Sequence, residues 1–272
     1  TNLGYDGHGE MNISNEGLVV SNGGSSLGYG ETGVGNVSIT TGGMWEVNKN
    51  VYTTIGVAGV GNLNISDGGK FVSQNITFGG DRASGIGTLN LMDATSSFDT
   101  VGINVGNFGS GIVNVSNGAT LNSTGYGFIG GNASGKGIVN ISTDSLWNLK
   151  TSSTNAQLLQ VGVLGKGELN ITTGGIVKAR DTQIALNDKS KGDVRVDGQN
   201  SLLETFNMYV GTSGTGTLTL TNNGTLNVEG GEVYLGVFEP AVGTLNIGAA
   251  HGEAAADAGY ITNATKVEFG SG

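Results

Sequence analysis

Several features that stabilise small exported domains or anchor proteins in membranes are missing from this sequence. It has no cysteine and a single proline among 272 residues. The lack of cysteine excludes disulfide bonds, so packing and backbone hydrogen bonds must hold the fold. The single proline excludes a collagen triple helix. No apolar run is long enough to be typical of a membrane-spanning helix.

Positive charge is also scarce, because 12 lysines and arginines stand against 22 acidic residues, a formal net charge of −10. A nucleic-acid partner is therefore not expected, since it requires a basic surface. No signal peptide is recognisable, and the sequence opens inside a repeat. We expect any targeting segment or membrane anchor to lie outside this sequence.

Glycine, by contrast, supplies 52 residues, and apolar residues recur at fixed places, which argues against disorder. A tetrad resembling Leu-Asn-Ile-Ser occurs ten times. Met11 and Leu245 open the first and last tetrads, and the nine steps between them give a mean repeat length of 26. The first apolar positions are Met11, Val37, Leu63, Leu89, Val113, Val139, Leu169, Val194, Leu218 and Leu245. Each is followed two residues later by another aliphatic residue, and this alternation predicts a strand with one buried face.

Two further apolar columns predict two more strands in each copy. One lies eight residues after the first position of the tetrad and includes Trp45, Phe71, Trp147 and Leu202, with Phe98 one place late. The other is an apolar residue followed by glycine, with Ile184-Ala185 as the exception. A glycine also precedes every tetrad by two positions. It indicates either a positive φ or close packing of backbone against backbone.

The repeat predicts an all-β fold, a parallel β-helix (β-solenoid) of about ten rungs with about 26 residues per rung, because one copy alone cannot close a core. A leucine-rich repeat, a calcium-binding nonapeptide repeat and a β-propeller each lack their required pattern. Residues 1–247 form the β-helix repeats. Residues 248–272 are predicted to be a divergent last rung or a junction to another region. The copy that begins at Val139 is four residues longer than the mean, and the extra residues near 151–157 predict a small outward loop.

Catalytic chemistry finds little support in the sequence, and we predict that the protein is not an enzyme. His8 and His251 are its only histidines, and neither has a regular partner. Asp67 and Asp93 lie one copy apart, but both belong to corners, where solvated carboxylates are common. A glycosidase needs two carboxylates facing one cleft. We therefore assign no catalytic, metal-binding or cofactor-binding residues and expect no cofactor.

Two surface features remain. Asparagine occupies the middle of the tetrad in seven of ten copies, where its neighbours point inward, and this predicts an outward ladder of amide hydrogen bonds. The copy at 178–197 is unusually charged. It indicates either local ion pairing or a partner-binding patch, for which the candidates are Lys178, Arg180, Asp181, Asp188, Lys189 and Lys191.

The frame Val-Gly-x-x-Gly-x-Gly-x-Leu-Asn-Ile-Ser-x-Gly-Gly, cleanest at 161–175 and matched at 55–69 and 210–221, resembles the passenger domains of AIDA-like, self-associating bacterial autotransporter adhesins. The resemblance covers essentially the whole chain. It implies a right-handed β-helix at the bacterial cell surface, secreted through the outer membrane by a C-terminal β-barrel translocator outside this sequence.

The function that this resemblance implies is an adhesin or structural stalk that contributes to self-association, biofilm formation or host attachment. Its partners would be copies of itself on neighbouring cells, or glycans or proteins of a host surface. The alternative is a carbohydrate-binding or carbohydrate-processing β-helix of the tailspike or lyase type. Aligned carboxylates or stacked aromatic residues on one outer face would favour that alternative.

Overall fold

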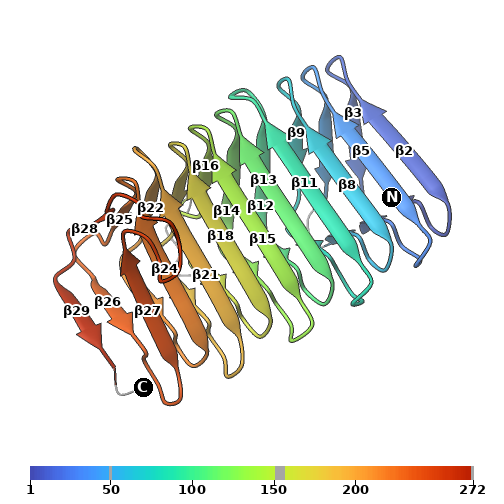
Figure 1. The fold of residues 1–272 in the computed structure, drawn as a ribbon. Coiled ribbons are helices and arrows are strands. Elements are labelled where there is room, and N and C mark those ends of the chain that lie inside the picture. The colour runs from blue at the N-terminus through green and yellow to red at the C-terminus, as the bar shows by residue number, and fades with distance from the viewer. Residues whose placement is uncertain (49–50, 151–156, 271–272) are drawn as a thin grey trace.

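The protein is a β-solenoid, seen in a computed structural model that describes residues 1–48, 51–150 and 157–270 (Figure 1). Twenty-nine strands and no helix occur in this described part, and every strand pairing between them is parallel. The chain therefore winds through about nine turns, each with the repeat length that the sequence predicts. The two chain ends lie at opposite ends of the stack. The loop predicted near 151–157 falls almost entirely on 151–156, which lie outside the described residues.

The first face of the solenoid is a ten-stranded sheet built from the tetrads. Its strands are β2 (His8–Ile13), β5 (Val34–Ile39), β8 (Val60–Ile65), β11 (Ile86–Met92), β13 (Ser110–Ser116), β15 (Lys136–Ser142), β18 (Lys166–Thr172), β21 (Lys191–Asp197), β24 (Thr215–Thr221) and β27 (Val242–Ile247). Equivalent residues pair in register, so that Asn90 lies between Asn64 and Asn114.

The second and third faces belong to one continuous sheet, because β12 (Ser97–Val105) and β14 (Thr120–Ile129) run through both. The second face also contains β3 (Leu18–Ser21), β6 (Met44–Val47), β9 (Lys70–Val72), β16 (Leu146–Asn148), β19 (Ile176–Lys178), β22 (Leu202–Glu204), β25 (Thr225–Asn227) and β28 (Tyr260–Thr262). The third contains β1 (Asn2–Leu3), β4 (Ser25–Leu27), β7 (Tyr52–Ile55), β10 (Asn75–Phe78), β17 (Leu158–Val161), β20 (Asp181–Ile184), β23 (Asn207–Val210), β26 (Glu232–Leu235) and β29 (Lys266–Phe269).

The interior is filled by the three apolar columns. Leu63, Ile65 and Trp147 are fully buried, and one apolar cluster runs from Ile13 to Leu235. Phe71 stacks on Phe98 with ring centroids 4.8 Å apart. The second column needs one correction, because the buried residue of β22 is Leu203 and Leu202 points outward. The preceding turn at 198–200, like the turn before Phe98, is longer by one residue than the other equivalent turns, which shifts the strand phase by one.

The two kinds of glycine serve different purposes. Gly137 precedes its tetrad by two positions, and a Cβ there would lie 2.1 Å from the carbonyl oxygen of Val105 in the previous turn. Close backbone packing therefore selects glycine at this corner. In the third column the reason is backbone conformation, since Gly162 has a φ of +77°. Ala185, the exception, adopts the same left-handed conformation with a φ of 55°.

The C-terminal stretch 248–270 contains both a departure from the repeat and its continuation. Residues 248–259 leave the stack, and Glu253 reaches back along the first face to Arg195, two turns earlier, at 3.0 Å. Strands β28 and β29 then pair with β25 and β26 and resume the second and third faces. On β27, Ile247 is 53% exposed, because β27 is the edge strand of the ten-stranded sheet. No helix in the described ranges is long and apolar enough to span a bilayer.

Candidate interaction surfaces

The six residues predicted as a partner-binding patch do not lie together. Lys178 is on the second face, Asp181 is on the third, and Lys191 begins a strand of the first. Asp188 and Lys189 belong to the connection that leads to β21. All six belong to one turn of the solenoid, so the chain distributes them around the circumference. A single flat partner cannot contact all of them.

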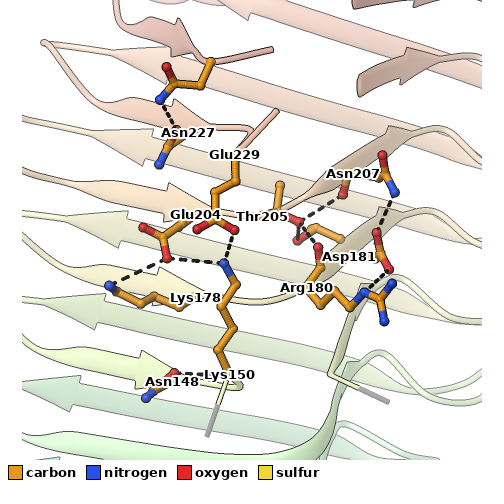
Figure 2. Close-up of polar contacts among 12 residues, drawn as sticks. Asn148, Lys150, Lys178, Arg180, Asp181, Glu204, Thr205, Asn207, Asn227 and Glu229 are labelled. Carbon is orange, nitrogen blue, oxygen red and sulfur yellow. Dashed lines mark hydrogen bonds and ion pairs between the residues drawn. The ribbon is translucent and has the colours of Figure 1, made fainter. Parts of the chain in front are cut away.

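Lys178 instead belongs to an ionic cluster that extends along the axis of the solenoid (Figure 2). Its Nζ lies 3.6 Å from Oε1 of Glu204, and the same oxygen lies 3.3 Å from Nζ of Lys150. Lys150 also pairs with Glu229. The side chain of Glu204 is only 16% exposed, so solvent screens this carboxylate less than it screens an open surface pair. The cluster balances two positive and two negative charges.

The sequence contains a signal for this cluster that inspection of a single copy misses. Lys178 and Glu204 are 26 positions apart, and Glu229 follows 25 positions later. Residues separated by one repeat meet on neighbouring turns, so their contact is invisible within one copy. The sequence prediction therefore missed Glu204 and Glu229, and it missed Lys150 as well.

The remaining charged candidates have local contacts. Nε of Arg180 lies 3.8 Å from Asp181, whose Oδ1 also accepts a hydrogen bond from Asn207 at 2.8 Å (Figure 2). Lys189 lies 3.9 Å from Asp188, and the Lys189 side chain is 90% exposed. Pairs as exposed as this one contribute little to stability.

The amide ladder expected from the tetrads is present on the first face. Asn90 donates to Oδ1 of Asn64 at 2.8 Å, and Asn114 donates in turn to Asn90 at 2.9 Å. Asn140 and Asn170 continue the series at 2.8 and 3.0 Å. The five amides are half-buried, so much of their hydrogen-bonding capacity is used within the ladder.

Aromatic side chains form short stacks on the third face. Tyr209 and Tyr234 lie in neighbouring turns with ring centroids 5.1 Å apart and an interplanar angle of 5°. Each ring covers a face of the other, which leaves less ring surface for a flat ligand to stack on. The Tyr234 hydroxyl donates to Oε2 of Glu232, and this hydrogen bond, with smaller effects of burial and nearby negative charge, raises the pKa of Tyr234 to about 12. Burial and the carboxylates of Asp181 and Glu232 raise the pKa of Tyr209.

Neither histidine lies in a catalytic arrangement within the described part of the chain. The Nε2 atom of His8 lies 3.1 Å from the side-chain nitrogen of Asn36, and His251 lies exposed in the segment 248–259. Among the described residues, no three histidine, aspartate or glutamate side chains come together as metal ligands would.

Comparison with known proteins finds a nearly identical relative for part of the chain. No family model matches the chain, and no solved structure matches it. An uncharacterized lipoprotein of Escherichia coli (strain K12), YdeK, is 98% identical over 180 residues, which cover 66% of this chain. The match spans only 14% of the length of that lipoprotein.

This comparison corrects the function expected from the repeat. The sequence predicts an autotransporter passenger acting as an adhesin, whereas the nearly identical relative is named a lipoprotein. The prediction fails because the repeat specifies a stackable β-solenoid turn, which proteins of different export routes and functions can share. The resemblance of the repeat to autotransporter passengers stays a prediction, and the chain is similar over 66% of its length to a lipoprotein.

Proposed function

We propose that this chain is a length-setting structural segment of a cell-envelope protein and that it performs no catalysis. The observation that carries the proposal is the unbroken in-register pairing of ten strands on the first face, from β2 to β27 (Figure 1). At about 4.8 Å between neighbouring strands, nine steps correspond to roughly 43 Å along the axis. The chain ends lie at opposite ends of this distance.

The contacts between turns favour a stiff segment. Interior strands pair with a neighbour on each side, and the apolar cluster continues across the turns. The ionic cluster adds a link between non-adjacent strands, because Lys150 follows β16 while Glu204 lies on β22. A sharp bend requires the interface between two neighbouring turns to open, because each turn packs on its neighbours.

The relative supports a place in the cell envelope. It is named a lipoprotein, and we infer for this chain a part in a membrane-anchored envelope protein. The lipoprotein name favours attachment to a membrane over the secretion through the outer membrane that the sequence predicts. The matched segment is 14% of the length of that lipoprotein, and the role proposed here is that of the segment alone.

The proposal is tested by shortening the solenoid in register. Deleting residues 61–110 removes two turns and joins Val60 to Gly111. Gly111 occupies the same strand position as Gly61, because both pair with Gly87 of β11, so the strand continues in register. In the longer envelope protein, with fluorophores on both sides of the segment, the distance between them should fall by roughly 10 Å. A control deletion of 64–110 joins Leu63 to Gly111, reverses the inward and outward positions within this strand, and should lower the unfolding midpoint strongly. An unchanged distance after the in-register deletion would contradict a length-setting role.

Absence of catalysis is tested separately with the purified chain. Turnover of any substrate in a glycan panel that disappears when one aspartate or glutamate is neutralised would overturn the non-catalytic part of the proposal. The length measurement is independent of that result.

A further inference from the structure

Three lysines form a row on the first face. Lys136, Lys166 and Lys191 are the first residues of β15, β18 and β21, three strands that lie side by side (Figure 1). The register pairs Lys136 with Lys166 and Lys166 with Lys191. Neighbouring strands are about 4.8 Å apart, so the fold holds three positive charges at this spacing. Like charges directly opposite each other in a sheet are destabilising.

These lysines stand apart from most other cations of the chain. Of the eleven lysines and arginines that the structure describes, six form ion pairs: Lys150, Lys178, Arg180, Lys189, Arg195 and Lys266. The three lysines of the row are exposed, and no carboxylate of the described residues forms an ion pair with their ammonium groups. A net charge of −10 makes a row of unpaired lysines unusual on this surface.

The row lies in a surface hollow whose backbone is tightly packed. The three lysines line an open hollow of about 340 Å³, together with Gly137, Gly167 and Glu168. A Cβ on Gly167 would lie 2.3 Å from the backbone nitrogen of Gly162, so the backbone beside Lys166 is tightly packed. The row ends at hydroxyl residues, because Ser110 pairs with Lys136 and Thr215 pairs with Lys191.

Two carboxylates limit the width of the hollow. Glu168 and Asp193 lie two residues after Lys166 and Lys191, about 7 Å further along their strands. Glu168 accepts a hydrogen bond from Asn170 at 2.7 Å. Coulomb energy falls with distance, so an anion in contact with the lysine row is attracted more strongly than these carboxylates repel it. Beyond the row the same strand position holds uncharged residues, Ser110 and Ile86 on one side and Thr215 and Val242 on the other, so a longer polyanion gains no further ion pair along it.

From this geometry we propose that Lys136, Lys166 and Lys191 form a binding site for a short, linear oligophosphate. The ligand lies along the solenoid axis, with its phosphate oxygens distributed over the three ammonium groups. The three charges span two strand spacings, roughly 10 Å. A ligand of this length engages all three lysines, whereas a single phosphate engages fewer. The site is independent of the structural role proposed above.

The test is calorimetric titration of the purified chain at low ionic strength with inorganic phosphate, pyrophosphate and tripolyphosphate. We expect saturable binding of tripolyphosphate at one site, at least tenfold tighter than binding of phosphate. Affinity should fall as salt is added, because exposed charges are screened within about 10 Å at 0.1 M. Absence of saturable tripolyphosphate binding would overturn the proposal, as would equal affinities across the series.

Matched variants locate the site. Lys166→Ser removes the central charge and should weaken tripolyphosphate binding about tenfold. Lys70→Ser removes a cation with no ion pair among the described residues, located on β9 of the second face, and should leave the affinity within twofold. Equal losses in the two variants would mean that binding follows net charge alone and would contradict the proposal. Both variants are checked for an unchanged thermal unfolding midpoint.

A further arm separates a soluble oligophosphate from membrane phosphate. Vesicles containing phosphatidylglycerol should not bind the chain, because its net charge of −10 is repelled by an anionic surface. Vesicle binding that Lys166→Ser abolishes, without tripolyphosphate binding, would replace the proposed ligand by a lipid headgroup and contradict the proposal.

Discussion

The indole N–H of Trp147 donates a hydrogen bond to Oγ of Ser123, 3.1 Å away in the neighbouring turn. Trp45 makes the same contact with Ser21 at 3.0 Å. Trp147 and Ser123 are fully buried, so this serine is the polar partner that lets a tryptophan occupy an apolar column. The structure thus shows a repeated solution to burying an indole in the stack.

This contact predicts the cost of removing the hydroxyl. Ser123→Ala leaves the indole N–H of Trp147 buried without its partner and should lower the free energy of unfolding by about 1–3 kcal/mol. Ser38→Ala, at a half-buried outward position of the first face, is the control and should change it by less than about 0.5 kcal/mol. Urea denaturation measures both. Equal midpoints for the two variants would show that the indole finds another acceptor.

The phase of the first-face strands predicts opposite outcomes for adjacent residues. Ile65 is fully buried, so Ile65→Asp loses roughly 1.5–3 kcal/mol of apolar burial and must also bury a carboxylate. Asn64→Asp should be mild, because the new carboxylate still accepts the hydrogen bond from Asn90. The measurement is the denaturation midpoint of each variant, and similar losses would refute the inward direction of Ile65.

Ala185 predicts a stabilising substitution. A non-glycine residue such as Ala185 in the left-handed region costs about 1–2 kcal/mol of backbone strain. Glycine removes this strain, but it also raises the entropy of the unfolded chain, which offsets part of the stabilisation. Ala185→Gly should therefore raise the free energy of unfolding by about 0.5–1 kcal/mol. The reverse change at the equivalent position, Gly162→Ala, should destabilise, because its Cβ would lie 2.2 Å from the carbonyl oxygen of Lys191. Thermal melts compare the two variants, and a lower midpoint for Ala185→Gly would count against backbone strain.

The hydrogen bond between Tyr234 and Glu232 predicts a pH dependence. The pKa of Tyr234 rises from 10.0 to about 12 on folding, so the folded state holds this proton more tightly than the unfolded state. The resulting stabilisation is complete below pH 10 and is lost as the pH rises through about 12. Glu232→Gln removes the charged acceptor and should lower the pKa of Tyr234, so that the variant loses less stability across this interval. Near-ultraviolet absorbance titration of the phenols measures the pKa. An unchanged titration curve in Glu232→Gln would contradict the assignment.

The sequence determined the architecture because the same physical requirement recurs in every copy. Aliphatic pairs such as Leu63 and Ile65 can be buried only by stacking, and a corner glycine such as Gly137 is required wherever two backbones come within contact distance. The outward direction of the asparagines follows from the same alternation. Small differences between copies limit how far the sequence pattern predicts individual buried residues. The turn before β22 is one residue longer, and the buried position there is Leu203 in place of Leu202.

Only the tertiary structure decided which charged side chains meet. The charged copy at 178–197 is continuous in sequence, but the winding of the chain separates Lys178, Asp181 and Lys191 onto three faces. It places Lys178 against Glu204 and Lys191 beside Lys166, residues that lie about one repeat apart. In a solenoid, side-chain neighbours on the surface are set by the register between turns. That register depends on the length of every intervening loop, so sequence order along one copy cannot supply it.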